Sequence, residues 1–178
     1  MRRIRQQLPE EEVTAIMERN AEGVLSLLGD DGYPYGVPVN YVWYEGKIYF
    51  HAAIAGHKKD AMENHEKVCF TVIDTHEVLS RDRATRYRSV IAFGHARFIT
   101  DPDEKRKALQ IFGYKHAGDF PEDVEQEIET TMDRTLTVEI TVDHITGKES
   151  KDLMLRRNQP KGTIESSDKE DYIIQGDQ

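Results

Sequence analysis

The spacing of apolar residues changes from a helical to a strand period after about the twentieth residue. Val13, Ile16 and Met17 recur at helical spacing behind a proline and three glutamates, which predicts an amphipathic helix over residues 9–20. From Gly23 onward, apolar and polar residues alternate between short turns such as 30–32 and 45–46. Connections this short join antiparallel strands, so a parallel βαβ architecture is excluded for this half of the chain.

The same pattern predicts six strands, at residues 23–28, 35–43, 47–51, 68–73, 87–99 and 135–145. Helices are expected at 57–64, from 102 to a stop near Gly113 or Gly118, and at 121–134, with a mobile polar loop at 74–86. The helices are inserted among the strands and do not alternate with them. We therefore expect a mainly β fold with peripheral helices, a six-stranded antiparallel split β-barrel whose closure removes exposed edges.

The length of 178 residues corresponds to one domain, which we place at residues 1–148. Residues 149–178 are charged and poor in apolar residues, apart from two short runs at 153–155 and 172–174. This predicts a C-terminal tail that is extended, partly disordered or draped over a partner subunit.

Charge argues against several partners. Lysine and arginine number 24 against 33 aspartates and glutamates, and the resulting formal charge of −9 disfavours binding to nucleic acid or anionic lipid. No stretch approaches the roughly 20 apolar residues of a membrane span, so we expect a cytoplasmic protein. The only cysteine, Cys69, lies in a strand-like run where a lone thiol usually acts as a small core hydrophobe.

Common nucleotide, nucleophile and metal motifs are absent from the sequence. It contains no glycine-rich dinucleotide fingerprint, no P-loop and no nucleophile elbow. The seven histidines are scattered, and none stands at zinc-ligand spacing, so we expect no metal site.

The most informative segment is residues 49–60. A strand ends at His51, small residues follow, and Gly56 precedes a helix whose first turn carries Lys58 and Lys59. Free N–H groups at a helix N-terminus bind anions, and lysines there are favourable if a phosphate balances them. A solvated basic patch after an ordinary turn is the alternative, and spacing does not decide between the two.

With its neighbours, this segment resembles the FMN-binding split-barrel superfamily related to pyridoxamine 5′-phosphate oxidase, in particular its nitroimidazole-reductase-like branch, that of the nitroimidazole resistance proteins. The matching pieces occur in the family's order over about residues 9–150, at 35–41, 50–52 with 56–58, 68–70, 87–94 and 145–148.

The resemblance implies a homodimer with two flavin sites between subunits. It places Pro38, Val39, Asn40 and Tyr41 beside the isoalloxazine, His51 and Ala52 at the turn next to the flavin, Lys58 on the phosphate, and Ser89 on the phosphate or the flavin edge. Pro38 lacks an N–H, which suits an interrupted or edge position. Side chains alternate along a strand, so Arg88 should face away from Ser89.

The function implied is that of an FMN-dependent oxidoreductase, with FAD as an alternative flavin. NAD(P)H would donate electrons and a small acceptor such as a nitroaromatic would receive them, with His51 positioning the flavin or donating a proton. Vitamin B6 oxidation is not expected, because no second basic cluster is evident for a substrate phosphate. A flavin- or haem-binding protein without turnover, acting in sensing or stress response, and a ligand-free dimeric protein remain alternatives.

Overall fold

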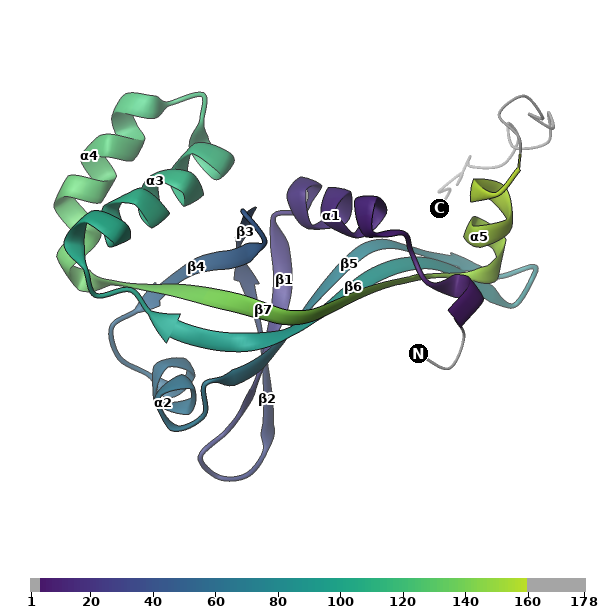
Figure 1. Ribbon diagram of the computed structural model, residues 1–178, viewed down its shortest axis with the longest axis horizontal. Helices are drawn as coiled ribbons and strands as arrows, with labels where there is room; N and C mark the ends of the chain where they lie inside the picture. Colours follow the sequence, from purple (N-terminus) through teal and green to yellow (C-terminus); the bar gives the residue numbers. More distant parts are fainter. Residues whose placement is uncertain (1–3, 160–178) are drawn as a thin grey trace, which may run out of the picture.

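The computed structural model describes residues 4–159, and it folds them around one seven-stranded antiparallel sheet with the order β2-β1-β5-β6-β7-β4-β3 (Figure 1). The strands are β1 (Glu22–Leu28), β2 (Pro34–Asn40), β3 (Val42–Tyr44), β4 (Lys47–Ala53), β5 (Lys67–Leu79), β6 (Ala84–Phe98) and β7 (Thr135–Glu149). The helices are α1 (Glu10–Arg19), α2 (His57–Asn64), α3 (Pro102–Ala117), α4 (Pro121–Thr131) and α5 (Lys151–Arg157), with 3-10 turns at Ile4–Gln6 and Met132–Arg134. The mainly β class with peripheral helices is confirmed.

The predicted single strand over residues 35–43 is wrong, because Tyr41 divides it into β2 and β3. The Tyr41 side chain is fully buried and its hydroxyl donates to the Met17 carbonyl at 2.8 Å, while its N–H donates to the Ala21 carbonyl at 2.9 Å. These bonds take Tyr41 out of the strand ladder. The sheet therefore has seven strands, not six.

Tyr41 is also the point at which the barrel is split. β2 and β3 lie at opposite edges of the sheet, yet Tyr41 alone connects them. The sheet must curl until its two edges approach each other at this point. Ladder pairing does not close the two edges among the described residues, so the expected removal of both edges by closure does not occur there.

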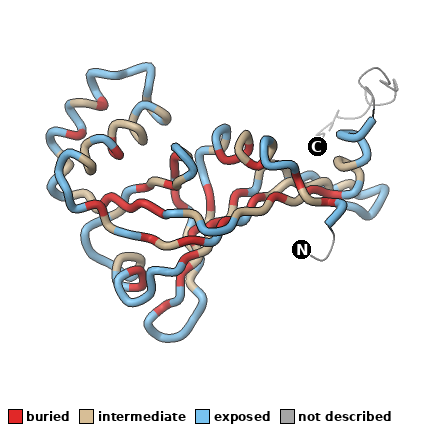
Figure 2. Tube along the Cα trace, viewed as in Figure 1, coloured by how far each residue is buried: buried red, intermediate tan, exposed pale blue. Residues whose placement is uncertain are grey.

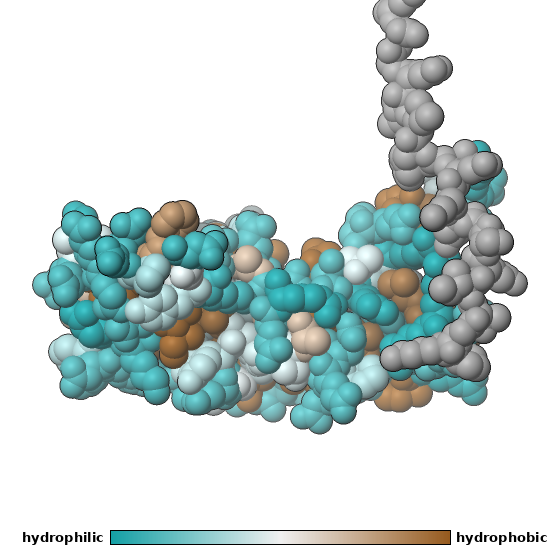
Figure 3. All heavy atoms as spheres, turned by 90° about the horizontal axis from the view of Figure 1, so that it is seen from above, coloured by the Kyte–Doolittle hydropathy of each residue, from teal (hydrophilic) through white to brown (hydrophobic). Residues whose placement is uncertain are grey.

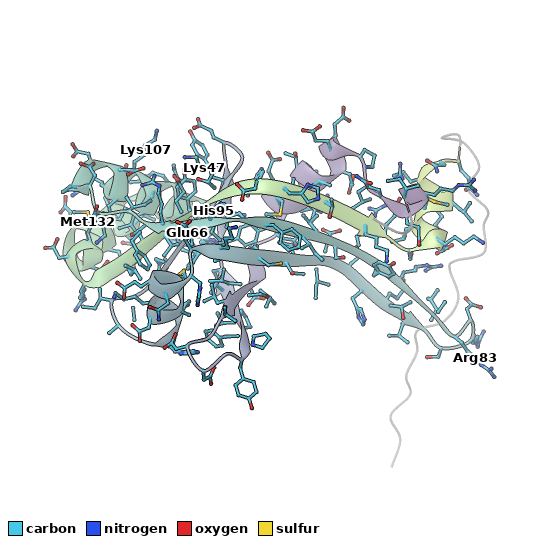
Figure 4. All side chains as sticks on the ribbon, turned by 60° about the horizontal axis from the view of Figure 1, so that its bottom comes forward. Lys47, Glu66, Arg83, His95, Lys107 and Met132 are labelled. Atoms are coloured by element: carbon cyan, nitrogen blue, oxygen red, sulfur yellow. The ribbon has the colours of Figure 1, made fainter. Side chains whose placement is uncertain are left out.

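The expected mobile loop over residues 74–86 is instead a hairpin arm. β5 and β6 continue to pair as far as Leu79 and Ala84, and Arg83 lies at the tip with a positive φ of 47° (Figure 4). A register shift at Asp74 lets its carboxylate accept hydrogen bonds from Arg19 at 2.7 and 2.8 Å and from Asn20 at 2.9 Å. β7 likewise runs beyond the expected end at residue 145 to Glu149, where it pairs with β6.

The core lies between α1 and the inner face of the sheet, where buried residues follow the strands (Figure 2). The expected apolar face of α1, Val13, Ile16 and Met17, is buried there. Gly147 of β7 allows this close approach, since a Cβ at that position would lie 2.7 Å from Val13 Cγ2.

Helices α3 and α4 form a hairpin over one end of the sheet, at the left in Figure 1. Asp101 caps α3 by accepting a hydrogen bond from the Glu104 N–H at 2.9 Å, as expected for a helix that starts at Asp101-Pro102. Gly113 lies inside α3 and does not end it. A Cβ there would come within 2.5 Å of Val124 Cγ1, so this glycine lets α4 pack closely.

At the other end of the molecule, the part of the expected tail that the structure describes begins with helix α5. Ser150 caps it, and fully buried Glu149 accepts hydrogen bonds from Arg157 at 2.7 Å and Arg88 at 3.3 Å. Residues 160–178 of the expected tail lie outside the described residues. Within residues 4–159, no helix is both long and apolar enough to cross a membrane.

Candidate functional site

The fold gathers most of the expected flavin residues where the two sheet edges meet. Val42 of β3 pairs with Tyr49 of β4, and Tyr41 joins β3 to β2, so Asn40 and His51 each lie two residues along the chain from this rung. Pro38 and Asn40 are exposed on edge strand β2, whereas the side chains of Val39 and Tyr41 belong to the core. Pro38 is thus on an edge strand, as its missing N–H indicated.

Of these residues, Tyr41 has both main-chain groups engaged within the chain. Its N–H donates to the Ala21 carbonyl, and its carbonyl accepts a hydrogen bond from His116 Nε2 at 3.1 Å. Polar main-chain contacts at this seam are therefore left to the edge-facing groups of Pro38, Val39 and Asn40, residues that pair with β1 on their other side.

His51 lies near the end of β4 and packs edge-on against Phe112 of α3, with 4.6 Å between ring centroids. Burial among these groups lowers its pKa from the ordinary value, and neighbouring His116 and Lys58 act in the same direction, although Glu127 opposes them. The imidazole keeps solvent contact. Because its pKa is lowered from about 6.5, it is mostly neutral near pH 7 and can both donate and accept a hydrogen bond.

Thr137 of β7 is the partner of His51 across the β4–β7 ladder, and sequence reasoning did not single it out. Its side chain is 1% exposed, and its hydroxyl has no hydrogen-bond partner among residues 4–159. A buried unpaired hydroxyl is uncommon. Polar and apolar residues alternate around Thr137 just as they do around the other threonines of β7, so only the tertiary structure distinguishes Thr137.

The start of α2 lies between β2 and β4. His57 contacts the Tyr35 ring edge-on at 4.7 Å, and Lys58 Nζ lies 6.0 Å from the centre of the Phe50 ring. Gly56 precedes the helix with a φ of 127°, which favours glycine, and no side chain caps the helix. The N–H groups of His57 and Lys58 are therefore available to a ligand, whereas that of Lys59 already donates to the Gly56 carbonyl at 2.9 Å.

The two lysines of α2 differ in their surroundings. Lys59 forms an ion pair with Glu63 at 2.5 Å, whereas Lys58 has no acidic partner among residues 4–159. Burial lowers the pKa of Lys58. Its ammonium is thus a partly desolvated cation beside free helix N–H groups, and an anion there would stabilise it.

The structure does not bring Ser89 to this site within one chain. Ser89 pairs with Lys148, which lies eleven residues along β7 from Thr137, the partner of His51. At the rise of an extended strand this separation is roughly 35 Å. The expected orientation of Arg88 away from Ser89 is confirmed, because Arg88 binds Glu149 and Glu12 on the α1 side.

Ser89 belongs instead to an open face of the sheet, here called the outer face. Three rungs across β5, β6 and β7 form it: Cys69–Phe93–His144, Thr71–Ile91–Thr146 and Ile73–Ser89–Lys148. Ile73, Ile91 and Phe93 are 61%, 37% and 49% exposed, which is unusual for large apolar residues so close together. Cys69 is half-buried on this face, so its expected place in the core is not found.

Within the described part of the chain, no group of three or more histidine, cysteine, aspartate or glutamate residues is arranged to hold a metal ion. The candidate site therefore consists of a helix N-terminus with a cation, an edge strand and a neutral imidazole.

Comparisons with solved structures agree with this fold. A 5-nitroimidazole antibiotic resistance protein from Bacteroides thetaiotaomicron is 22% identical with a TM-score of 0.67, over 80% of this chain and 86% of the other. A conserved hypothetical protein from Mycobacterium tuberculosis is 16% identical with a TM-score of 0.70, over 90% and 94%. An FAD- and haem-binding protein from Mycobacterium smegmatis is 17% identical with a TM-score of 0.68, over 86% and 80%.

At these identities the likeness establishes the fold alone. No curated protein matches the chain. The family model described as pyridoxamine 5′-phosphate oxidase matches residues 9–149, which span the sheet, the helical hairpin and every residue of the candidate site. The chain therefore belongs to the pyridoxamine 5′-phosphate oxidase family.

Proposed function

We propose that this protein binds FMN at the seam between its sheet edges and passes electrons from NAD(P)H to a small oxidised acceptor, such as a nitroaromatic compound. The observation that carries the proposal is Lys58, a half-buried cation without an acidic partner among residues 4–159, beside the uncapped start of α2. A phosphate would satisfy both the lysine and the helix N–H groups.

The residues of the seam fit the rest of a flavin. Pro38, Val39 and Asn40 offer main-chain groups of an edge strand to a polar ring edge, and Ala52 leaves room beside them. When bound, FMN would supply the two-electron chemistry, while the chain supplies orientation and electrostatics. Neutral His51 can hold a hydrogen bond to the ring or give a proton to a reduced acceptor.

Ser89 fits the same site only if a second copy of the chain provides it, because roughly 35 Å of strand separates it from His51 in one chain. The outer face, with exposed Ile73, Ile91 and Phe93, is a suitable apolar surface for such a copy. We therefore propose a homodimer whose flavin sites take residues from both subunits.

The family and the similar structure named for binding FAD and haem support flavin binding, and the one named for nitroimidazole resistance supports a nitroaromatic acceptor. An absorption spectrum of the purified protein tests the first step. Flavin bands would support the proposal, a Soret band would point to haem, and a colourless protein that takes up no flavin in a titration would refute it.

The lysine pair offers a matched test of the phosphate contact. Lys58→Ala should weaken FMN at least tenfold and riboflavin, which lacks the phosphate, hardly at all. Lys59→Ala removes the same charge type one residue away, but from a lysine already paired with Glu63, and should change neither affinity more than about twofold. Equal losses of FMN and riboflavin in Lys58→Ala would remove Lys58 from the phosphate site.

Turnover is tested separately from binding. In a stopped-flow experiment, NADPH or NADH should bleach the bound flavin, and a nitroimidazole should restore its colour. Flavin that stays oxidised with both donors would leave a flavin-binding protein without this activity.

A further inference from the structure

A cavity of about 130 Å³ lies beneath the α3–α4 hairpin and opens to solvent. The apolar part of its wall comes from Leu109, Phe112, Val124 and Ile128, and His51 and Thr135 form the side nearest the sheet. Phe112 continues the aromatic contacts of this wall to His116, at 4.4 Å between ring centroids. Apolar atoms show among hydrophilic ones at this end of the molecule (Figure 3).

The size of the cavity limits what it can hold. An apolar cavity of about 150 Å³ in another protein accepts benzene, so 130 Å³ has room for one aromatic ring and not for a fused ring system. The tricyclic flavin proposed above therefore does not fit here. Phe112 in the cavity wall favours an aromatic ring over an aliphatic one of equal volume.

The polar groups at the cavity are hydrogen-bond acceptors. His116 Nε2 faces the Tyr41 carbonyl, which can only accept, so this nitrogen carries the proton. Burial lowers the pKa of His116, so the ring is mostly neutral near pH 7 and its Nδ1 has a free lone pair. Glu127 also lines the cavity, and its carboxylate has no hydrogen-bond or ion-pair partner among residues 4–159.

From this combination we infer that the cavity under the α3–α4 hairpin is a binding site for a single-ring aromatic compound that carries an O–H or N–H donor. The ring packs against Phe112, and the donor binds an acceptor of the cavity wall, either the Glu127 carboxylate or His116 Nδ1. This goes beyond the proposed flavin function, because the site is formed by one chain and needs no flavin. A ring bound here also contacts His51 and so lies beside the proposed reaction site.

Phenol and toluene are a suitable pair of probes, because they have similar size and differ in the donor. We expect a chemical-shift titration of the full-length ¹⁵N-labelled protein, without flavin, to show saturable phenol binding. Phenol should bind about tenfold more tightly than toluene, the effect expected of one hydrogen bond to a charged acceptor. No saturable binding of phenol would overturn the site, and a phenol-to-toluene ratio below threefold would overturn the role of the acceptors.

Two substitutions locate the binding. Ala117→Leu fills the cavity from α3 and Thr131→Leu fills it from α4, and each should reduce phenol affinity at least tenfold. Ala15→Leu is the control. It makes the same alanine-to-leucine change as Ala117→Leu, but on α1 and away from the cavity, and it should leave phenol affinity unchanged. Circular dichroism checks that each variant is folded. Two filling variants are used so that the test can still be made if one of them does not fold. Wild-type phenol affinity in a folded filling variant would show that phenol binds elsewhere.

The same titration on flavin-loaded protein keeps the two proposals apart. Failure of phenol binding in both forms removes only the ring site, whereas failure to load flavin removes only the flavin proposal.

Discussion

Glu139 provides the sharpest test of how this fold is held together. Its side chain is 2% exposed and lies on β7, on the same side of the sheet as Thr137 and Thr135. It accepts hydrogen bonds from Arg97 at 2.8 and 3.0 Å, from Tyr49 at 2.9 Å and from Lys47 at 3.0 Å. Arg97 also binds Glu104 in the first turn of α3. One carboxylate thus connects β4, β6 and β7, and through Arg97 the helical hairpin.

The effect of this network on stability follows from the pKa of Glu139. Burial alone would raise that pKa, but hydrogen bonds from Arg97, Lys47 and Tyr49 outweigh it and lower the pKa from 4.5 to about 2. A lowered folded-state pKa stabilises the protein above pH 4.5, and this stabilisation is lost as pH falls towards 2. A shift of this size corresponds to about 3 kcal/mol at pH 7, nearly all of which remains at pH 4.5, whereas about 1 kcal/mol remains at pH 3.

Glu139→Gln removes the charge and keeps the shape. We expect the variant to be about 3 kcal/mol less stable than the wild type at pH 7, and this difference should shrink by about 2 kcal/mol by pH 3. Urea unfolding followed by circular dichroism at a series of pH values measures both quantities. Glu122→Gln, the same substitution on the exposed surface of α4, is the control.

A difference between wild type and Glu139→Gln that stays constant from pH 7 to pH 3 would refute this reasoning. It would mean that the ionised state of Glu139 is not what stabilises the fold.

Substitutions at three further positions test other parts of the structure by urea unfolding. Thr137→Val should leave stability unchanged or raise it by up to about 1 kcal/mol, because the buried hydroxyl has no partner among residues 4–159, and a loss above about 1 kcal/mol would show that it is hydrogen-bonded after all. Asp101→Ala should cost about 1 kcal/mol through loss of the α3 cap, whereas Asp101→Asn should cost much less, and equal costs would contradict the capping role. Gly94→Ala should cost about 2 kcal/mol or more, because a Cβ there would overlap the Thr141 carbonyl oxygen. A cost below about 0.5 kcal/mol would argue against the bulge that places the two strands so close.

The local pattern of the sequence determined the elements whose partners are near in the chain. The periodicity of Val13, Ile16 and Met17 gave α1, and the aspartate–proline pair at 101–102 gave the start of α3. The short turns gave antiparallel neighbours, and the residues from His51 to Lys58 gave a strand end followed by a helix start. In each case the cause is a backbone or side-chain preference that acts within a few residues.

The tertiary structure alone decided the features that depend on distant contacts. Tyr41 alternates with its neighbours like any strand residue, and only bonds to Ala21, Met17 and His116 remove it from the ladder and split the barrel. Glu139 has the sequence context of a surface position, but groups from β4 and β6 make its burial favourable. Three features depend on which segments meet in space: the pairing of strands that are distant in the chain, the burial of charge and the shape of the cavity. The hydrophobic period does not encode that information.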